Sequence, residues 1–496
     1  METVKSTETM KKRVLSSALW STISKLVGQS ITLGSTLILA RILQKEDFGL
    51  MAMALTYTGL VDNFVDFGFL SAIIQAKEIS SKLLNSCFWF LMVSVLVVCG
   101  ASVLGASHIA HLFAEPRLKT MIAVMAMSLV FIPSQIICRG IFSRDMRIDT
   151  MALIELVAGV MRALITVVFA YRGAGVWSFV YGYFAEKVML SLAFPIMAKW
   201  RPRLEYDSDG VRGILLFGAN VSVSSLLWYL FNKSDVFIVG RLLGAGTLGV
   251  YSIALQVATS IYQFIYVAWN RIAYPLFSRY QQSDQLILVF YKTSALLSFF
   301  AFPACIGLAA IAPDVVTVLF GEQWAAATVP IQFISVVTAI RSISSLLPSL
   351  LNSIGHPNEN VKVNFYSFIL FSGMFYLSAT WHGLNGVLWA WVILYPIRHM
   401  VLLSIACKLT QLSFLEYVRW HMGSTLSTVF MFFTVVFVSS MGADWNIYVR
   451  LSVCIACGAA VYTVLQAFIS KKLMDVLLGL IQNKSPISSP EVSSNG

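Results

Sequence analysis

The sequence predicts an all-α integral membrane protein with about fourteen transmembrane helices, and two observations support this prediction. Charged residues make up 12% of the 496 residues and hydrophobic residues 58%, whereas a soluble domain carries about 25% charged residues. Apolar runs of roughly 20 residues, long enough to cross the hydrocarbon core as a helix, recur along the chain. Helices are expected because each one satisfies its own backbone hydrogen bonds in lipid.

The predicted spans follow one another through short connections. They cover approximately residues 14–40, 48–75, 84–111, 118–141, 150–171, 175–197, 213–239, 247–269, 287–311, 327–351, 361–380, 385–406, 422–441 and 447–469. Basic residues gather on the loops that lie on the same side as the N-terminus, which predicts that both ends are cytoplasmic. The net charge of +11 is therefore an orientation signal, and no nucleic acid partner is expected.

One short phrase occurs twice in the chain. Residues 39–55 read LARILQKEDFGLMAMAL, and residues 239–255 read VGRLLGAGTLGVYSIAL, so that Arg41 recurs as Arg241. Because an even number of predicted spans separates the copies, the two halves should be parallel repeats, an arrangement found in secondary transporters.

The repeat predicts a domain organisation of two parallel six-helix lobes followed by two additional helices. The N-terminal lobe covers residues 1–198, a cytoplasmic linker covers 199–212, and the C-terminal lobe covers 213–407. The two additional transmembrane helices lie within 408–470. The polar tail at 471–496 is expected to be cytoplasmic and disordered.

The first predicted helix carries a polar stripe. Lys25 and Gln29 stand on it at helical spacing, with threonines before and after them, and Asn232 stands on the equivalent stripe of the second lobe. Polar side chains facing lipid are costly, so both stripes should face protein or water. Hydrogen bonding between packed helices is an alternative for the hydroxyl residues. That alternative does not account for Lys25, because a cation at mid-span is costly unless it is solvated or paired.

Three aspartates are candidates for ion coupling. Asp62 and Asp66 are four residues apart on one helical face, where two carboxylates can share one proton. A carboxyl group that gains and loses a proton is what a proton-coupled carrier needs. The alternative is that Asp66 is hydrated or paired with Lys82. Asp235, close to the polar stripe of the second lobe, is the third candidate, for a proton or another cation.

Other ionisable residues at membrane depth are interpreted as structural. Glu155 and Arg162 are seven residues apart on one helical face, so an ion pair within this helix or bridged from it is expected. Glu186 and Lys187 are assigned structural roles. The histidines stand near the ends of spans, where interfacial positions are expected.

Arg341 stands among serines in its predicted helix. A guanidinium group there could grip phosphate through two parallel hydrogen bonds. The alternative is a buried salt bridge to an acid such as Asp235. Together with Lys25 and Arg271, Arg341 forms a cationic set distributed over both lobes. If these three residues line a shared cavity, the ligand should be an anion.

Motifs of enzymes and of nucleotide-driven pumps are absent from the sequence. It contains no G-x-x-x-x-G-K-[ST], no H-E-x-x-H and no G-x-S-x-G. Transport would therefore be secondary, and no catalytic residue is expected. Cys454 and Cys457 form a C-x-x-C without a neighbouring His or acidic residue, so no metal or redox site is expected there.

Four phrases together carry a resemblance to a known family. They are ARILQKEDFGLMAMALTYTGLVDNFVDFGFLSAIIQAKEIS, GRLLGAGTLGVYS, RIAYPLFSRYQQ and VLFGEQW. With them the sequence resembles the polysaccharide transporter (PST) family of the multidrug/oligosaccharidyl-lipid/polysaccharide (MOP) superfamily, in particular the colanic-acid-exporter-like, Wzx-type flippases of lipid-linked oligosaccharides. The resemblance extends over approximately residues 14–472.

The resemblance implies a MATE-like fold with a central cavity, working by alternating access in the bacterial inner membrane. The substrate would be an undecaprenyl-diphosphate-linked repeat unit, moved from the cytoplasmic to the periplasmic face for exopolysaccharide, capsule or O-antigen biosynthesis. Lys25, Arg271 and Arg341 would hold the diphosphate, and Gln29 and Asn232 would face the sugar. Besides membrane lipid, a polysaccharide polymerase and chain-length machinery would be partners.

No cofactor is expected, because a proton or sodium gradient would supply the energy. The predicted span at 361–380 contains no acidic residue, so a carboxylate-rich sodium site there is not expected. Proton coupling through Asp62, Asp66 or Asp235 is favoured instead.

Two alternative functions remain open from the sequence. A multidrug exporter of the same superfamily would extrude organic cations and should have an acidic cavity, which the cationic set does not favour. A membrane polysaccharide polymerase or ligase would need a long outer loop bearing arginines, and no such loop is predicted.

Overall fold

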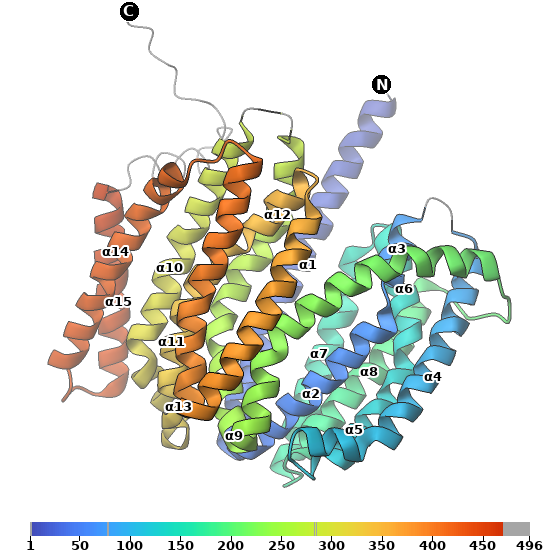
Figure 1. The fold of residues 1–496 in the computed structure, drawn as a ribbon, viewed down its shortest axis with the longest axis horizontal. Coiled ribbons are helices and arrows are strands. Elements are labelled where there is room, and N and C mark those ends of the chain that lie inside the picture. The colour runs from blue at the N-terminus through green and yellow to red at the C-terminus, as the bar shows by residue number, and fades with distance from the viewer. Residues whose placement is uncertain (1, 77–78, 282, 284, 470–496) are drawn as a thin grey trace, which may run out of the picture. The chain divides into compact units, whose positions relative to one another are not determined.

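The computed structural model describes residues 2–76, 79–281, 283 and 285–469, and side chains are described within these ranges except at 2–19, 217, 219–221 and 266–275. Over the described residues the chain is helical and contains no strand, as the sequence predicts. Figure 1 shows the helices as long rods joined by short connections.

The chain divides into two compact units. Unit 1 comprises Met1–Ile253 and Asn364–Val387, and unit 2 comprises Ala254–Val363 and Leu388–Gly496. The lobe boundaries that the sequence repeat suggests stay a prediction.

The helices of unit 1 come mainly from the first half of the chain. They are α1 (Glu2–Ile42), α2 (Lys45–Asp66), α3 (Phe69–Gln75), α4 (Ser81–Leu112), α5 (Leu118–Met127), the 3-10 turn η1 (Ser128–Phe131), α6 (Ile132–Arg144), α7 (Ile148–Tyr171), α8 (Trp177–Ala198) and the first part of α9 (Ser208–Arg279).

Unit 2 begins within α9 and contains the remaining helices. They are α10 (Leu286–Leu319), the 3-10 turn η2 (Glu322–Ala327), α11 (Thr328–Ser344), α12 (Leu346–Ser353), the two ends of α13 (Pro357–Leu409), α14 (Phe414–Met441) and α15 (Ile447–Ile469). The middle of α13 belongs to unit 1.

Twelve helical segments of the described chain are long and apolar enough to cross a membrane. Two of them, Ser222–Ile265 with 44 residues and Pro357–Leu409 with 53 residues, are about twice the length that one crossing needs. Each is interrupted by a glycine with non-helical torsion angles, Gly244 in α9 and Gly383 in α13. Counting each of these segments as two crossings raises the twelve to the fourteen that the sequence predicts.

The phrase that occurs twice in the sequence forms a close helix crossing within unit 1. A Cβ atom added to Gly49 in α2 would lie 1.8 Å from the carbonyl oxygen of Ala245, and one added to Gly249 would lie 1.8 Å from the carbonyl oxygen of Lys45. Each copy therefore needs its glycine because the backbone of the other copy passes directly over it. The reciprocal contact accounts for the glycine of each copy.

Packing within each unit joins consecutive helices and also helices that are far apart in the chain. In unit 1, α7 packs against both α8 and α1, and α4 packs against α5; in unit 2, α10 packs against α11 and α14, and α14 packs against α15. Large side chains such as Phe69 and Phe142 fill the core of unit 1, and Phe290 and Leu347 belong to that of unit 2.

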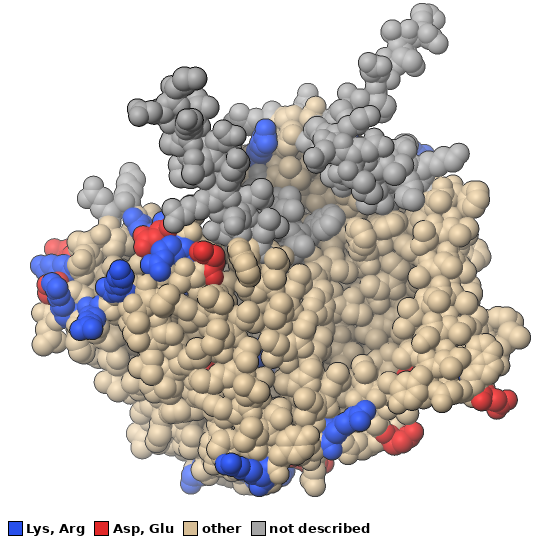
Figure 2. Space-filling model, turned by 180° about the vertical axis from the view of Figure 1, so that it is seen from behind, with Lys and Arg blue, Asp and Glu red and all other residues tan. Residues whose placement is uncertain are grey.

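The outer surface of the helices is apolar, as expected for a multi-pass membrane protein. Leu104 on α4 is 85% exposed and Phe468 on α15 is 75% exposed, an arrangement that water would penalise and lipid would not. On the face shown in Figure 2, charged side chains gather near the edges and leave broad areas free of charge. The protein is therefore a multi-pass membrane protein whose helices present apolar side chains to lipid.

Candidate functional site

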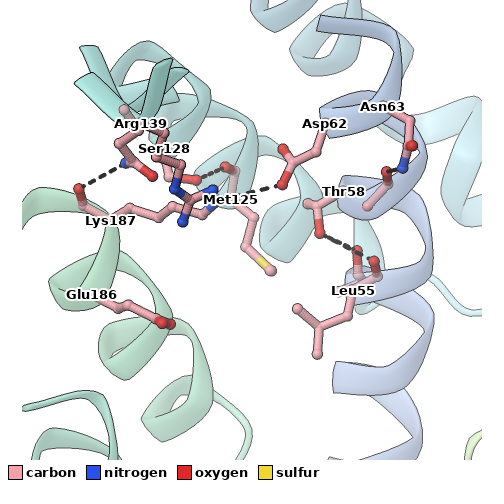
Figure 3. Close-up of polar contacts among 12 residues, drawn as sticks. Leu55, Thr58, Asp62, Asn63, Met125, Ser128, Arg139, Glu186 and Lys187 are labelled. Atoms are coloured by element: carbon pink, nitrogen blue, oxygen red, sulfur yellow. Dashed lines mark hydrogen bonds and ion pairs between the residues drawn. The ribbon is translucent and has the colours of Figure 1, made fainter. Parts of the chain in front are cut away.

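An ion pair at membrane depth joins α2 to α8 in unit 1. Lys187 Nζ lies 3.3 Å from Asp62 Oδ2, and Figure 3 shows the two side chains pointing toward each other from their helices. The ammonium group also lies 5.3 Å from the centre of the Tyr183 ring, which is a cation–π distance. Asp62 Oδ1 is buried and has no hydrogen-bond partner among the described residues. One oxygen of this carboxylate can therefore accept a proton without displacing an existing donor.

Two more ion pairs lie on the neighbouring helices of unit 1. Arg162 Nη1 is 3.1 Å from Glu186 Oε2, and Arg139 Nη2 is 3.1 Å from Glu155 Oε1. Of the two expected arrangements, the ion pair within α7 is wrong, and ion pairs bridged from α7 to neighbouring helices are found. Glu155 and Arg162 both stand on α7, and seven residues advance about 10 Å along a helix. Each side chain consequently finds its partner on an adjacent helix, α6 or α8, rather than on its own.

Asp66 is the fourth acid of this cluster, and it has a different kind of partner. Its Oδ1 accepts a hydrogen bond of 3.3 Å from the backbone N–H of Leu70, in the first turn of α3. No ion pair with Lys82 is found among the described residues. Asp62 and Asp66 thus have separate partners.

The charged side chains of this part of unit 1 do not balance. We call the set the unit 1 charge network; it consists of the three ion pairs and of Asp66, which interacts electrostatically with Arg139, so its members are Asp62, Asp66, Arg139, Glu155, Arg162, Glu186 and Lys187. Four carboxylates face three cations, so the network carries one net negative charge when every acid is ionised. One proton would neutralise it.

Asp235 on α9 has partners on its own helix. Its side chain is only 1% exposed, and it accepts hydrogen bonds from the Tyr251 hydroxyl at 2.6 Å and from the backbone N–H of Val236 at 2.7 Å. A buried carboxylate with two such donors is stabilised in place. Its proposed role in ion coupling stays a prediction.

The polar stripes of α1 and α9 place their members differently. Lys25 is exposed, and no ion pair with it is found among the described residues. Gln29 and Asn232 are half-buried, and Asn232 Nδ2 donates to the carbonyl of Trp228 at 2.8 Å. Arg271 belongs to α9, and its side chain lies outside the described residues.

One member of the second stripe contacts α2 directly. The Tyr229 hydroxyl donates to the carbonyl oxygen of Thr56 at 2.8 Å. Gly59 makes room for it, because a Cβ atom at that position would lie 2.5 Å from the Tyr229 hydroxyl oxygen. This side chain of the stripe therefore faces protein, as the cost of exposing polar groups to lipid predicts.

Unit 2 brings a second arginine near Arg341. Arg341 is half-buried on α11, and Arg398 on α13 lies close enough for the two cations to interact electrostatically. The Arg398 guanidinium carbon lies 5.7 Å from the centre of the Tyr395 ring, which fixes the side chain by a cation–π contact. The sequence analysis did not single out Arg398. Its signal was available, since a charge within an apolar span is a functional candidate by default.

Two histidines of unit 2 are buried rather than interfacial, contrary to the sequence-based expectation. His399 is 4% exposed and His421 is 6% exposed. His399 Nδ1 lies 2.6 Å from the Ser344 hydroxyl oxygen, and His421 Nδ1 lies 2.8 Å from the carbonyl oxygen of Tyr417. Each partner satisfies one ring nitrogen of its histidine. Sequence position alone did not reveal this burial.

A further buried ion pair in unit 2 also escaped the sequence analysis. Arg450 on α15 binds both carboxylate oxygens of Asp314 on α10, with Nε 3.0 Å from Oδ2. The Asp314 side chain is only 6% exposed. The pair ties α15 to α10.

Comparison with protein families identifies the group to which this chain belongs. Residues 38–329 match the sequence profile of a family described as "Polysaccharide biosynthesis protein". The chain belongs to this family. It is also 28% identical over 381 residues to the lipopolysaccharide biosynthesis protein WzxC of Escherichia coli (strain K12), an alignment that covers 76% of this chain and 77% of that protein.

Two solved structures share the fold of this member of the polysaccharide biosynthesis family. The lipid II flippase MurJ in an inward closed conformation gives a TM-score of 0.72 at 15% identity, over 92% of this chain and all of MurJ. An inward-facing multidrug resistance MATE family transporter of the MOP superfamily gives 0.62 at 13% identity, over 80% of this chain and 97% of the transporter. These likenesses confirm the MATE-like fold expected from the sequence.

Proposed function

We propose that this protein is a flippase for lipid-linked oligosaccharides, a carrier rather than an enzyme. It moves an undecaprenyl-diphosphate-linked repeat unit across the membrane by alternating access, for exopolysaccharide, capsule or O-antigen biosynthesis. The observation that carries the proposal is the family match at residues 38–329, in a polysaccharide biosynthesis family, on a chain that adopts the fold of a lipid II flippase. Polysaccharide polymerase and chain-length proteins would receive the product on the other side.

The charge distribution of the loops supports the proposed direction of transport. Basic residues concentrate on the loops that share a side with the N-terminus, which favours cytoplasmic positions for both ends in the bacterial inner membrane. The repeat unit would enter on that side and leave at the periplasmic side.

Cations on the helices would bind the diphosphate. Lys25 is exposed without an ion pair among the described residues, and Arg341 lies near Arg398, an arrangement that a diphosphate would stabilise by adding negative charge. Arg271 would complete the set. The amide groups of Gln29 and Asn232 would donate and accept hydrogen bonds with sugar hydroxyl groups.

The unit 1 charge network would couple transport to a proton gradient. A proton on Asp62 neutralises the carboxylate and removes its ion pair with Lys187. This ion pair joins two helices, because Asp62 stands on α2 and Lys187 on α8. Loss of that attraction would let the two helices adopt a second arrangement. The single excess negative charge of the network suits exchange of one proton, and a sodium ion is the alternative. Asp66 and Asp235 are the other candidate carboxylates.

The proposal is tested with purified protein in lipid vesicles that carry a fluorescent undecaprenyl-diphosphate oligosaccharide in the inner leaflet. An impermeant glycosidase outside the vesicles reports the repeat units that have crossed. We expect crossing that depends on the protein and accelerates when a proton gradient is imposed. Vesicles without protein measure spontaneous movement. Protection of the oligosaccharide under every imposed proton and sodium gradient would disprove the proposal.

A multidrug exporter is the second candidate, because the multidrug transporter structure shares this fold. That function predicts that organic cations such as ethidium move out of loaded vesicles. Lys25, which is exposed, and the pair of arginines Arg341 and Arg398 argue against a multidrug exporter. Positively charged side chains repel a cationic substrate. Ethidium transport without oligosaccharide transport would decide in its favour.

A further inference from the structure

A basic pocket lies at one end of unit 1, apart from the charge network. It has a volume of about 530 Å³ and is lined by Ser81, Asn85, Pro195, Ile196, Lys199, Trp200, Arg201 and Arg203. Three of these residues are cationic, and none is acidic. A volume of this size accommodates a small polar molecule or a lipid headgroup.

The segment that carries the three cations is fixed in place by hydrogen bonds to α4. The Arg203 backbone N–H donates to Asn85 Oδ1 at 3.3 Å, and its carbonyl accepts from Trp89 Nε1 at 2.9 Å. A few residues later, the backbone N–H of Asp207 donates to the Ser86 hydroxyl oxygen at 2.7 Å. The backbone of this linker is therefore held in one position, and the pocket is formed before any ligand arrives.

The turn into the pocket has an unfavourable backbone conformation. Lys199, the residue that follows α8, has a φ of 53°, a left-handed value that residues other than glycine seldom adopt. The next residue, Trp200, turns inward and packs its ring edge-on against Phe88, with the ring centres 5.4 Å apart. This turn directs the tryptophan into the protein and leaves Lys199 exposed at the rim.

The cations of the pocket have no acidic partner among the described residues. No ion pair is found there for Lys199, Arg201 or Arg203. The two acids of the linker are engaged elsewhere: Glu205 Oε2 accepts from Asn85 Nδ2 at 3.0 Å, and Asp207 Oδ1 accepts from the backbone N–H of Gly210 at 3.1 Å.

A buried donor without a partner adds an independent observation. Trp200 is only 9% exposed, and its Nε1 has no hydrogen-bond partner among the described residues. An unsatisfied buried N–H is uncommon and indicates a missing acceptor. Trp200 also lines the pocket, beside the three cations.

We propose that this pocket binds the phosphate group of a lipid at the cytoplasmic surface of the membrane. The inference uses the cytoplasmic orientation given under the proposed function but does not require flippase activity. Juxtamembrane clusters of Lys and Arg attract anionic lipids, and the two arginines can each grip a phosphate with two parallel hydrogen bonds. Two lipids carry this chemistry: an anionic phospholipid, and a polyprenyl diphosphate that waits here before transport.

The positive-inside rule alone explains the sign of these charges but not their arrangement. Orientation during insertion depends only on the number of Lys and Arg residues in a loop. It requires neither a fixed backbone nor a pocket nor a buried donor. Removing two positive charges from the pocket and, separately, two from elsewhere therefore distinguishes a binding site from an orientation signal.

The test measures lipid binding to the full-length protein by native mass spectrometry, with phosphatidylglycerol, undecaprenyl diphosphate and phosphatidylcholine as probes. We expect the double variant Arg201→Gln/Arg203→Gln to bind both anionic lipids about thirtyfold more weakly, since each basic residue near the surface contributes about fivefold. Phosphatidylcholine binding should not change. The variant Arg201→Lys/Arg203→Lys should recover part of the affinity, because it restores charge without the paired hydrogen bonds.

The control removes the same charge from a different place. Lys119→Gln/Arg172→Gln changes two cations at the ends of α5 and α7 that are predicted to lie outside, and it should alter binding less than twofold. Equal losses in the pocket variant and the control would overturn the proposal. Protease accessibility of the C-terminal tail reports whether the pocket variant inserts in the correct orientation. A pocket variant that inserts in the inverted orientation but binds anionic lipids normally would also overturn the proposal. Tighter binding of undecaprenyl diphosphate than of phosphatidylglycerol assigns the pocket to the transport substrate, and the reverse assigns it to a membrane phospholipid.

Discussion

The charges at membrane depth are arranged differently in the two units. In unit 1 the acids and bases alternate between helices, as in the pairs Asp62 with Lys187 and Glu186 with Arg162. In unit 2, Arg341 and Arg398 lie near each other, and the buried acid Asp314 on α10 is bound by Arg450 on α15. The unit 1 charge network is thus nearly neutral, whereas Arg341 and Arg398 of unit 2 are two neighbouring like charges.

This difference suggests a division of roles between the units. A nearly neutral network of ion pairs changes its total charge with each proton, which suits energy coupling. Neighbouring cations repel each other and are stabilised by an anion, which suits binding of a diphosphate. If the division is correct, substitutions in the unit 1 charge network should alter the response to a proton gradient, whereas those at Arg341 and Arg398 should alter the apparent affinity for substrate.

The largest effect on stability is expected at the Asp314–Arg450 pair, which should have no role in transport. Arg450→Met leaves a carboxylate with 6% exposure without its guanidinium, and removing one partner of a buried pair costs about 3 kcal/mol. The free energy of unfolding, measured by denaturant titration in detergent, should fall by this amount. Transport per folded molecule should remain within twofold of the original protein. A transport defect larger than twofold would mean that the Asp314–Arg450 pair takes part in transport. The proposed division of roles between the units would then be wrong.

Substitution of Lys187 should reduce both stability and transport. Lys187→Met leaves Asp62 without its cation, and we expect a loss of about 2 kcal/mol, less than for a fully buried pair because the Asp62 side chain is 33% exposed. Translocation in vesicles should fall at least tenfold and lose its acceleration by a proton gradient. Denaturant titration and the glycosidase assay measure the two effects on one preparation.

The double variant Asp62→Asn/Lys187→Met separates structure from coupling. It removes both charges, so most of the lost stability should return. Transport should stay uncoupled, because no carboxylate remains at this position to accept a proton. Recovery of gradient-driven transport together with stability would mean that the pair is only structural.

Arg398 should affect substrate affinity with little effect on stability. Arg398→Gln relieves repulsion with Arg341 and removes one charged donor, so the substrate concentration that gives half-maximal transport should rise about tenfold, as expected for one charge-assisted hydrogen bond. Its response to a proton gradient should be unchanged. Arg419→Gln is the matched control, because Arg419 is 66% exposed on α14 and pairs with Glu416 on its own helix. An unchanged half-maximal concentration in the Arg398 variant would remove this pair of arginines from substrate binding.

The sequence predicted the fold more completely than the site, and the reason is physical. Hydropathy marks each crossing because lipid imposes a minimum length of apolar helix. The repeated phrase even marked a contact, since Gly49 and Gly249 are required by the backbone that crosses each of them. Hydropathy is a property of one helix, and the repeated phrase occurs twice in the same chain. A single sequence therefore displays both signals.

Ion-pair partners depend on the rotation and neighbours of each helix, which a single sequence does not display. Glu155 and Arg162 share a face, yet each binds a residue of another helix. For the same reason the burial of His399 depends on Ser344, which stands 55 positions earlier in the chain. Residue type and predicted depth in the membrane identify the candidate charged residues. Their ion-pair partners are known only from the packing of the helices.

The smallest effect is expected at an exposed ion pair of unit 1, which shows how much of the comparison depends on burial. Arg117 Nε lies 2.8 Å from Glu115 Oε1 in the loop before α5, and the Arg117 side chain is 57% exposed. Exposed pairs contribute about 0 to 1 kcal/mol because water screens them and the long side chains lose rotational freedom. Arg117→Gln should therefore change the unfolding free energy by less than about 0.5 kcal/mol and leave transport, coupling and affinity unchanged. A loss as large as that of Lys187→Met in the same denaturant titration would mean that removing any cation from unit 1 has this effect, and the distinct role of the buried network would no longer follow.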